Sequence, residues 1–196
     1  MSIFSYFQNR KLKQMTALRQ RIYRPLAQSG SVLFVFDGGT PGCEEAIRHL
    51  CSTLQHLRLP YQGICLDLNR KQRVGSWVEE LSDIRVLQRK HLTLFGSPFK
   101  KKHPQLQALM QEEFGLFLNL TIQSSYAEAC LTAASKAHLK AGLKDAQNKE
   151  LQKAYDICFA YRAPETDLDD TTRKTFPEWT KKIIDYLTDI KSSTPK

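Results

Sequence analysis

The chain has 196 residues, of which 41% are hydrophobic and 25% are charged, and its formal net charge is +9. This length and composition suit one globular domain that buries its own core and needs no disulfide or metal to hold it together. No apolar run approaches the roughly 20 residues that cross a bilayer, so no membrane-spanning segment is predicted.

The cysteines indicate a reducing compartment. The sequence has five of them and no Cys-x-x-Cys pair, and Cys65 and Cys158 lie in apolar runs, where cysteine acts as a small hydrophobe. Residues 1–26 have scattered charges and lack the continuous apolar stretch of a secretory signal. We therefore expect the protein in the cytoplasm.

In chain order, the first predicted element is a basic amphipathic helix over residues 1–26. Its apolar residues at roughly helical spacing are Phe4, Phe7, Met15, Leu18 and Ile22. Lysine and arginine fill the positions between them, and Pro25 ends the pattern.

From residue 27 onward, short apolar runs alternate with helical stretches. The runs predict strands at 32–36, 61–68, 84–87, 92–95, 114–120, 139–143 and 155–161. Helices are predicted from the turn at 38–42 to about Leu57, around 77–81, from 103–104 onward, and after Ser125 and Thr175. The last two begin with the S/T-x-x-E capping box. Residues 144–153 and 165–170 are predicted to be polar and acidic connections.

This alternation predicts an α/β fold, in the form of a Rossmann-like three-layer sandwich with a mostly parallel sheet of five or six strands. A two-layer α+β arrangement with a mixed sheet is the alternative. We expect residues 1–26 to form a separate N-terminal helix, 27–191 a single α/β domain, and 192–196 a disordered tail.

Polar side chains follow three of the predicted strands. They are Asp37, Asp67, and Asn119 with Thr121. In an open α/β sheet, ligands bind beyond the carboxyl ends of the strands, so these side chains are candidates for holding a small polar ligand. The alternative is that each strand simply ends in an ordinary polar turn former.

The turn after the first strand contains Asp37, Gly38, Gly39 and Thr40. A glycine-rich turn between a strand and a helix can present backbone N–H groups to a phosphate. This one has neither the lysine of a P-loop nor the G-x-G-x-x-G spacing. Glutamates at 44 and 45 already place negative charge in the first helical turn. We therefore favour a capped turn, with Thr40 or Asp37 as the cap.

No catalytic residue, metal site or cofactor is predicted. The histidines occur in no H-E-x-x-H motif and beside no paired cysteines. No serine lies in a G-x-S-x-G elbow.

Two segments are strongly basic and contain no acidic residue. The first lies before Asp37 and holds Arg10, Lys11, Lys13, Arg19, Arg21 and Arg24. The second covers residues 84–103 and includes Lys100, Lys101 and Lys102. Such segments bind anionic membrane surfaces or nucleic-acid backbones, or they pack an apolar stripe on the domain and leave their charges in water.

Three short motifs carry a resemblance to a known family. The sequences FGLFLNLT at 114–121, ASKAHLKAG at 134–142 and YDI at 155–157 resemble an uncharacterised conserved family of Bacteroidetes proteins, which implies no activity. The strand–helix–strand–Gly pattern is also similar to the N-terminal half of heptosyltransferase-like glycosyltransferases. That likeness implies a Rossmann-type fold only, because the chain is too short for their second domain.

These observations lead to two functional expectations. The first is a non-enzymatic protein whose basic segments bind a phosphate-bearing partner, either nucleic acid or a membrane surface. The alternative is a transferase-like enzyme that binds a small molecule or nucleotide sugar at the carboxyl ends of the strands.

Overall fold

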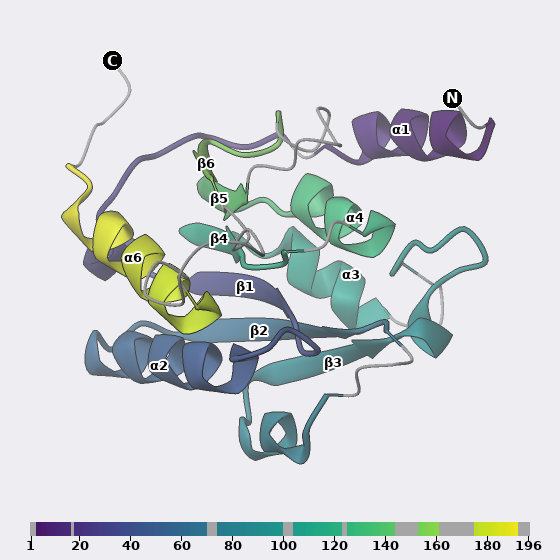
Figure 1. The fold of residues 1–196 in the computed structure, drawn as a ribbon. Coiled ribbons are helices and arrows are strands. Elements are labelled where there is room, and N and C mark those ends of the chain that lie inside the picture. The colour runs from purple at the N-terminus through teal and green to yellow at the C-terminus, as the bar shows by residue number, and fades with distance from the viewer. Residues whose placement is uncertain are drawn as a thin grey trace, which may run out of the picture.

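The computed structural model describes residues 3–16, 18–69, 74–99, 104–122, 125–143, 153–160 and 175–191 (Figure 1). The domain boundaries expected at 26 and 191 stay predictions. Residues 192–196 and the lysines at 100–102 lie outside the described residues.

The described strands form one six-stranded parallel sheet in the order β3-β2-β1-β4-β5-β6. The strands are β1 (Val32–Asp37), β2 (Tyr61–Asp67), β3 (Ile84–Gln88), β4 (Leu116–Asn119), β5 (Leu139–Leu143) and β6 (Ile157–Phe159). This confirms the predicted α/β class, and the strand order reverses between β1 and β4, as in doubly wound sheets.

Helices cover both faces of the sheet and make three layers (Figure 1). On one face, α2 (Cys43–His56) and α6 (Phe176–Asp189) pack against Phe34 and Phe36 of β1. On the other, α3 (Pro104–Gln111) and α4 (Tyr126–Ala134) pack against Leu33 and Val35. Because both faces are covered, β1 is apolar along nearly its whole length.

Short 3-10 turns connect several of these elements. They are η1 (Leu26–Gln28), η2 (Ser76–Glu80) and η3 (Arg89–His91). Both capping boxes occur: Glu128 accepts the Ser125 N–H at 3.2 Å, and Glu178 accepts the Thr175 N–H at 2.8 Å. None of the helices in the described part of the chain is long and apolar enough to cross a membrane.

The prediction of one continuous helix over 1–26 is wrong in its second half. Helix α1 spans Ile3–Met15 and packs Leu12 on α4, whereas the described residues from 18 to 25 are not helical. There, Arg19 bonds to Asp156, and the Ile22 N–H donates to the His138 carbonyl at 3.3 Å. These tertiary bonds replace the hydrogen bonds that a helix would have supplied.

The strand predicted at 92–95 is also wrong. The chain turns there, because the Gly96 N–H donates to the Thr93 carbonyl at 2.9 Å and the Thr93 N–H donates to the Ser97 carbonyl at 2.8 Å. Leu94 is almost fully exposed, so the apolar run reflects no burial in a sheet.

Candidate functional site

The parallel strands bring the predicted polar residues to one edge of the sheet. Asp37 ends β1, Asp67 ends β2 and Asn119 ends β4. The strand register pairs Asn119 with Val35 and Asp67 with Gln88. The predicted residues therefore share an edge, but their side chains are engaged in separate local contacts.

The Asp37 turn is held by its own hydrogen bonds. The Asp37 carboxylate accepts the Gly39 N–H at 3.0 Å, and its carbonyl accepts the Thr40 N–H at 3.2 Å. The Gly38 N–H donates to Leu66, and the Cys43 N–H donates to Thr40. Because these four N–H groups already have acceptors, the turn offers little to a phosphate.

Neither residue that we expected to cap helix α2 does so. The N-cap is Gly42, with a φ of 75°, and no side chain caps this end of the helix. Close packing explains the glycine at position 38. A Cβ on Gly38 would lie 2.4 Å from Val74 Cγ2 and 2.6 Å from Cys65 Sγ. The turn is thus specified by packing at Gly38 and by backbone conformation at Gly42.

Asn119 and Thr121 belong to a buried polar cluster. The Asn119 Oδ1 accepts both the N–H and the hydroxyl of Thr121, each at 2.9 Å. The Asn119 Nδ2 donates to Glu128 and, at 2.6 Å, to the Tyr155 hydroxyl. The polar groups of this cluster have hydrogen-bond partners and are buried away from water. The cluster joins β4, α4 and the residues before β6, so we assign it a structural role.

Tyr155 stays a hydrogen-bond donor at the centre of this cluster. Its hydroxyl donates to Glu128 at 3.0 Å and lies 3.4 Å from the Thr132 hydroxyl. Burial, and then the charge of Glu128, raise the pKa of Tyr155 well above its ordinary value. The ring occupies the space beside Gly142, where a Cβ would lie 2.4 Å from Tyr155 Cε1.

A hollow of about 1000 Å³ lies at the ends of β2 and β3. The residues around it include Asp67, Asn69, Val74, Gln88, Arg89 and Lys90. Gln88 donates to the Asp67 carboxylate at 3.2 Å, and the Gln88 N–H donates to His91 Nδ1 at 3.1 Å. These bonds hold Asp67 and Gln88 in place beside the hollow, whereas the neighbouring Arg89 is exposed.

A second hollow, of about 680 Å³, opens beside the glycine turn. Thr40, Glu44, Glu45 and Arg48 are among the residues around it. Arg48 pairs with Glu44 at 3.0 Å and with Glu80 at 2.6 Å, so its charge is engaged by two carboxylates. This side of the turn is therefore acidic and unsuited to a phosphate.

Of the basic residues predicted to form a surface, some are exposed and others form ion pairs. Arg10, Lys11, Lys13 and Arg24 are exposed. Arg19 is not part of a basic surface, because its side chain is only 8% exposed and binds Asp156. Arg21 is exposed for most of its length but also reaches Asp156, at 3.2 Å.

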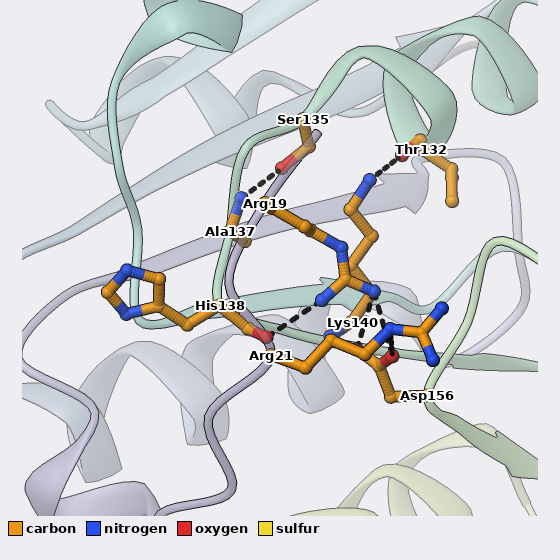
Figure 2. A network of polar contacts seen from close by, with 8 residues as sticks. All are labelled: Arg19, Arg21, Thr132, Ser135, Ala137, His138, Lys140 and Asp156. Atoms are coloured by element: carbon orange, nitrogen blue, oxygen red, sulfur yellow. Dashed lines mark hydrogen bonds and ion pairs between the residues drawn. The ribbon is translucent and has the colours of Figure 1, made fainter. Parts of the chain in front are cut away.

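Sequence reasoning missed the ion-pair network around Asp156 (Figure 2). The Asp156 side chain is 1% exposed and accepts two bonds from Arg19 Nη2, at 2.8 and 2.7 Å. It also accepts the backbone N–H of Lys140 at 2.8 Å. Arg19 Nη1 donates to the His138 carbonyl at 2.8 Å, which ties the N-terminal segment to the start of β5.

Lys140 lies beside this network with its amine buried (Figure 2). The amine donates to the Thr132 carbonyl at 2.6 Å, near the C-terminal end of α4. Burial, followed by the charge of Arg19, lowers the pKa of Lys140 to about 7. The lysine inside a predicted strand was the one sign of this network in the sequence. The Arg19–Asp156 pair could not be predicted, because the two residues lie 137 positions apart.

Among the described residues, no three of the His, Cys, Asp and Glu side chains are grouped to hold a metal ion. Burial raises the pKa of Cys43 to about 12 and that of Cys130 to about 11, so both remain thiols at neutral pH.

The fold and its polar interior define a parallel α/β protein of Rossmann-like strand order. The chain belongs to a family of unknown function, DUF6913, whose match covers residues 3–167. No curated protein and no solved structure matches it. The family resemblance is thereby confirmed at its coarse level, whereas the Bacteroidetes origin and the heptosyltransferase likeness stay predictions.

Proposed function

We propose that this protein binds a phosphate-rich partner through the outer surface of α1, as a binding protein and not as an enzyme. The observation that carries the proposal is the exposure of Arg10, Lys11 and Lys13 around the buried Leu12. Successive helix residues point about 100° apart, so anchoring Leu12 on α4 turns these three cations toward solvent.

Charge composition supports the same partner. The chain carries +9 overall and has no acidic residue before Asp37. The cations of α1 therefore have no local carboxylate on their own segment to neutralise them. Phosphate groups of a nucleic acid or a lipid surface supply the missing negative charge.

Salt dependence tests this proposal. Three phosphate contacts predict roughly a 20-fold loss of affinity between 50 and 200 mM salt for single-stranded RNA. The triple variant Arg10→Gln, Lys11→Gln and Lys13→Gln should lose most binding to RNA and to phosphatidylglycerol vesicles alike. A control with the same change in charge replaces Arg58, Lys181 and Lys191, which are exposed elsewhere. Negligible binding of the unaltered chain to both probes at 50 mM salt would contradict the proposal.

The hollow beside Arg89 supports a second candidate function, the binding of a small anionic molecule. It lies beyond the carboxyl ends of β2 and β3, at the edge of the sheet where open α/β sheets bind ligands although away from the switch point, and the exposed Arg89 lies beside it. The hollow beside the Asp37 turn is acidic and the Asn119 cluster is closed to water, whereas this hollow is open and has Arg89 and Lys90 beside it. The nucleotide-sugar alternative is therefore best placed at Asp67, Gln88 and Arg89.

Thermal shift assays with inorganic phosphate, nucleotides and sugar nucleotides test this second candidate. A ligand in the hollow should raise the Tm of the unaltered chain, and Arg89→Ala should abolish that rise while Arg85→Ala preserves it. The candidate fails if no compound shifts the Tm, or if Arg89→Ala responds like the unaltered chain.

A further inference from the structure

Exposed apolar side chains concentrate in the two acid-free basic segments. Among the described residues, the exposed large hydrophobic side chains are Phe7 at 60%, Leu18 at 98%, Leu94 at 95%, Phe95 at 57% and Tyr186 at 53%. All but Tyr186 lie before Asp37 or within 84–103, the segments that hold the excess positive charge. Apolar exposure and positive charge thus coincide.

The structure places these two segments side by side. The Gln8 side-chain amide on α1 donates to the Phe95 carbonyl at 3.4 Å. Gln8 follows Phe7 in the chain, so the N-terminal half of α1 adjoins the turn that carries Leu94 and Phe95. Figure 1 shows α1 and the loop between β3 and α3 on the same side of the molecule.

The turn at residues 93–97 has a defined conformation. Besides the two backbone bonds already described, the Ser97 N–H donates to the Thr93 hydroxyl at 3.0 Å. Gly96 has a φ of 79°, a left-handed conformation that favours glycine. Three hydrogen bonds therefore hold Leu94 and Phe95 at the tip of a turn that projects them into solvent, although both side chains would gain by leaving water.

We propose that this surface, formed by Phe7, Leu94 and Phe95 beside the cations of α1, inserts into an anionic lipid surface. A lipid interface supplies phosphate groups for Arg10 and Lys11 together with an apolar layer for Leu94 and Phe95. RNA would satisfy the cations and could stack on phenylalanine, but it offers no apolar layer for leucine. The inference rests on the proposed function, because α1 makes the phosphate contacts.

Vesicle binding tests the apolar part of this surface. The double variant Leu94→Ser, Phe95→Ser should bind vesicles of phosphatidylglycerol and phosphatidylcholine at least ten-fold more weakly than the unaltered chain, with RNA binding unchanged. Tyr186→Ser, which removes an exposed ring outside the basic segments, should keep full vesicle binding. Equal vesicle affinity for the double variant and the unaltered chain would overturn the inference.

Tryptophan quenching measures insertion directly and does not depend on that variant. In Phe95→Trp, brominated acyl chains should quench the new fluorophore when vesicles bind, while the native Trp77 and Trp179 are buried in the protein and give an unquenched background. Vesicle binding without quenching, or RNA binding without vesicle binding, would overturn insertion and leave the proposed function standing. Binding to neither probe would overturn both.

Discussion

The amine of Lys140 is buried at the edge of an ion-pair network and donates to the Thr132 carbonyl. Burial disfavours its charged form, and Arg19 disfavours it further, whereas Asp156 opposes both effects. The pKa of Lys140 falls from its ordinary 10.5 to about 7, so this lysine changes charge near neutral pH.

Stability should therefore depend on pH through Lys140. Between about pH 7 and 10.5 the unfolded chain holds a proton on this amine that the folded chain has released, so the free energy of unfolding rises with pH across that window. Urea unfolding should show this rise in the unaltered chain and a flatter profile in Lys140→Met. Parallel profiles for the two proteins would contradict a lowered pKa.

Gly142 is required by the Tyr155 ring, which occupies the place of a side chain. Gly142→Ala should cost about 1–3 kcal/mol of unfolding free energy, because overpacking forces the ring or the strand to move. The same substitution in a Tyr155→Leu background should cost clearly less, since the ring is gone. Equal costs in both backgrounds would show that the ring is not the obstacle.

At the scale of elements, short apolar runs predicted the fully buried strands and also the partly exposed β3 and β6, but one predicted strand is a turn. The runs at 32–36 and 139–143 are β1 and β5 almost to the residue. Apolar side chains mark β1 throughout, whereas β5 also contains Lys140. The run at 92–95 is also largely apolar but is a turn, in which Leu94 and Phe95 are exposed and Leu92 packs against the core. Composition does not distinguish residues that are buried in the fold from residues exposed at a surface.

The N-terminal segment shows the opposite difficulty. Its periodicity favours one helix over 1–26, but Arg19 and Ile22 bond to residues around β5. Those partners lie more than a hundred positions away in the sequence, at separations of 119 and 137 for Arg19, so no local pattern reveals them. The predicted site shows the same limit of local patterns. The strand ends do share an edge of the sheet, but Asp37 and Asn119 each accept hydrogen bonds from nearby backbone N–H groups.

Removal of Arg19 should release this segment from the sheet. Breaking a buried ion pair on one side costs about 3–5 kcal/mol, because the remaining charge stays buried. In Arg19→Met, hydrogen exchange should therefore accelerate at least ten-fold at Ile22 and in α1, while β1 and β4 keep their protection. Arg21→Met should have little effect, because its side chain is 65% exposed. Unchanged exchange in Arg19→Met would show that the Arg19–Asp156 ion pair does not hold the segment in place.

At the scale of the whole molecule, the fold brings the cations of α1 beside an exposed apolar turn. The cations of α1 lie on a helix that adjoins the Leu94–Phe95 turn, whereas Asp37 and Asn119 at the carboxyl edge of the sheet are engaged in internal hydrogen bonds. Composition predicted the positive charge of both segments. Their proximity depends on the fold, which brings residue 8 beside residue 95.

Cosedimentation of the full chain with lipid vesicles tests this account most directly. At 100 mM salt, the protein should pellet with vesicles that contain phosphatidylglycerol and remain in the supernatant with pure phosphatidylcholine. Raising the salt should weaken binding, because the α1 cations act electrostatically. Equal recovery with both kinds of vesicle, or no recovery with either, would contradict the assignment of this surface to an anionic lipid partner.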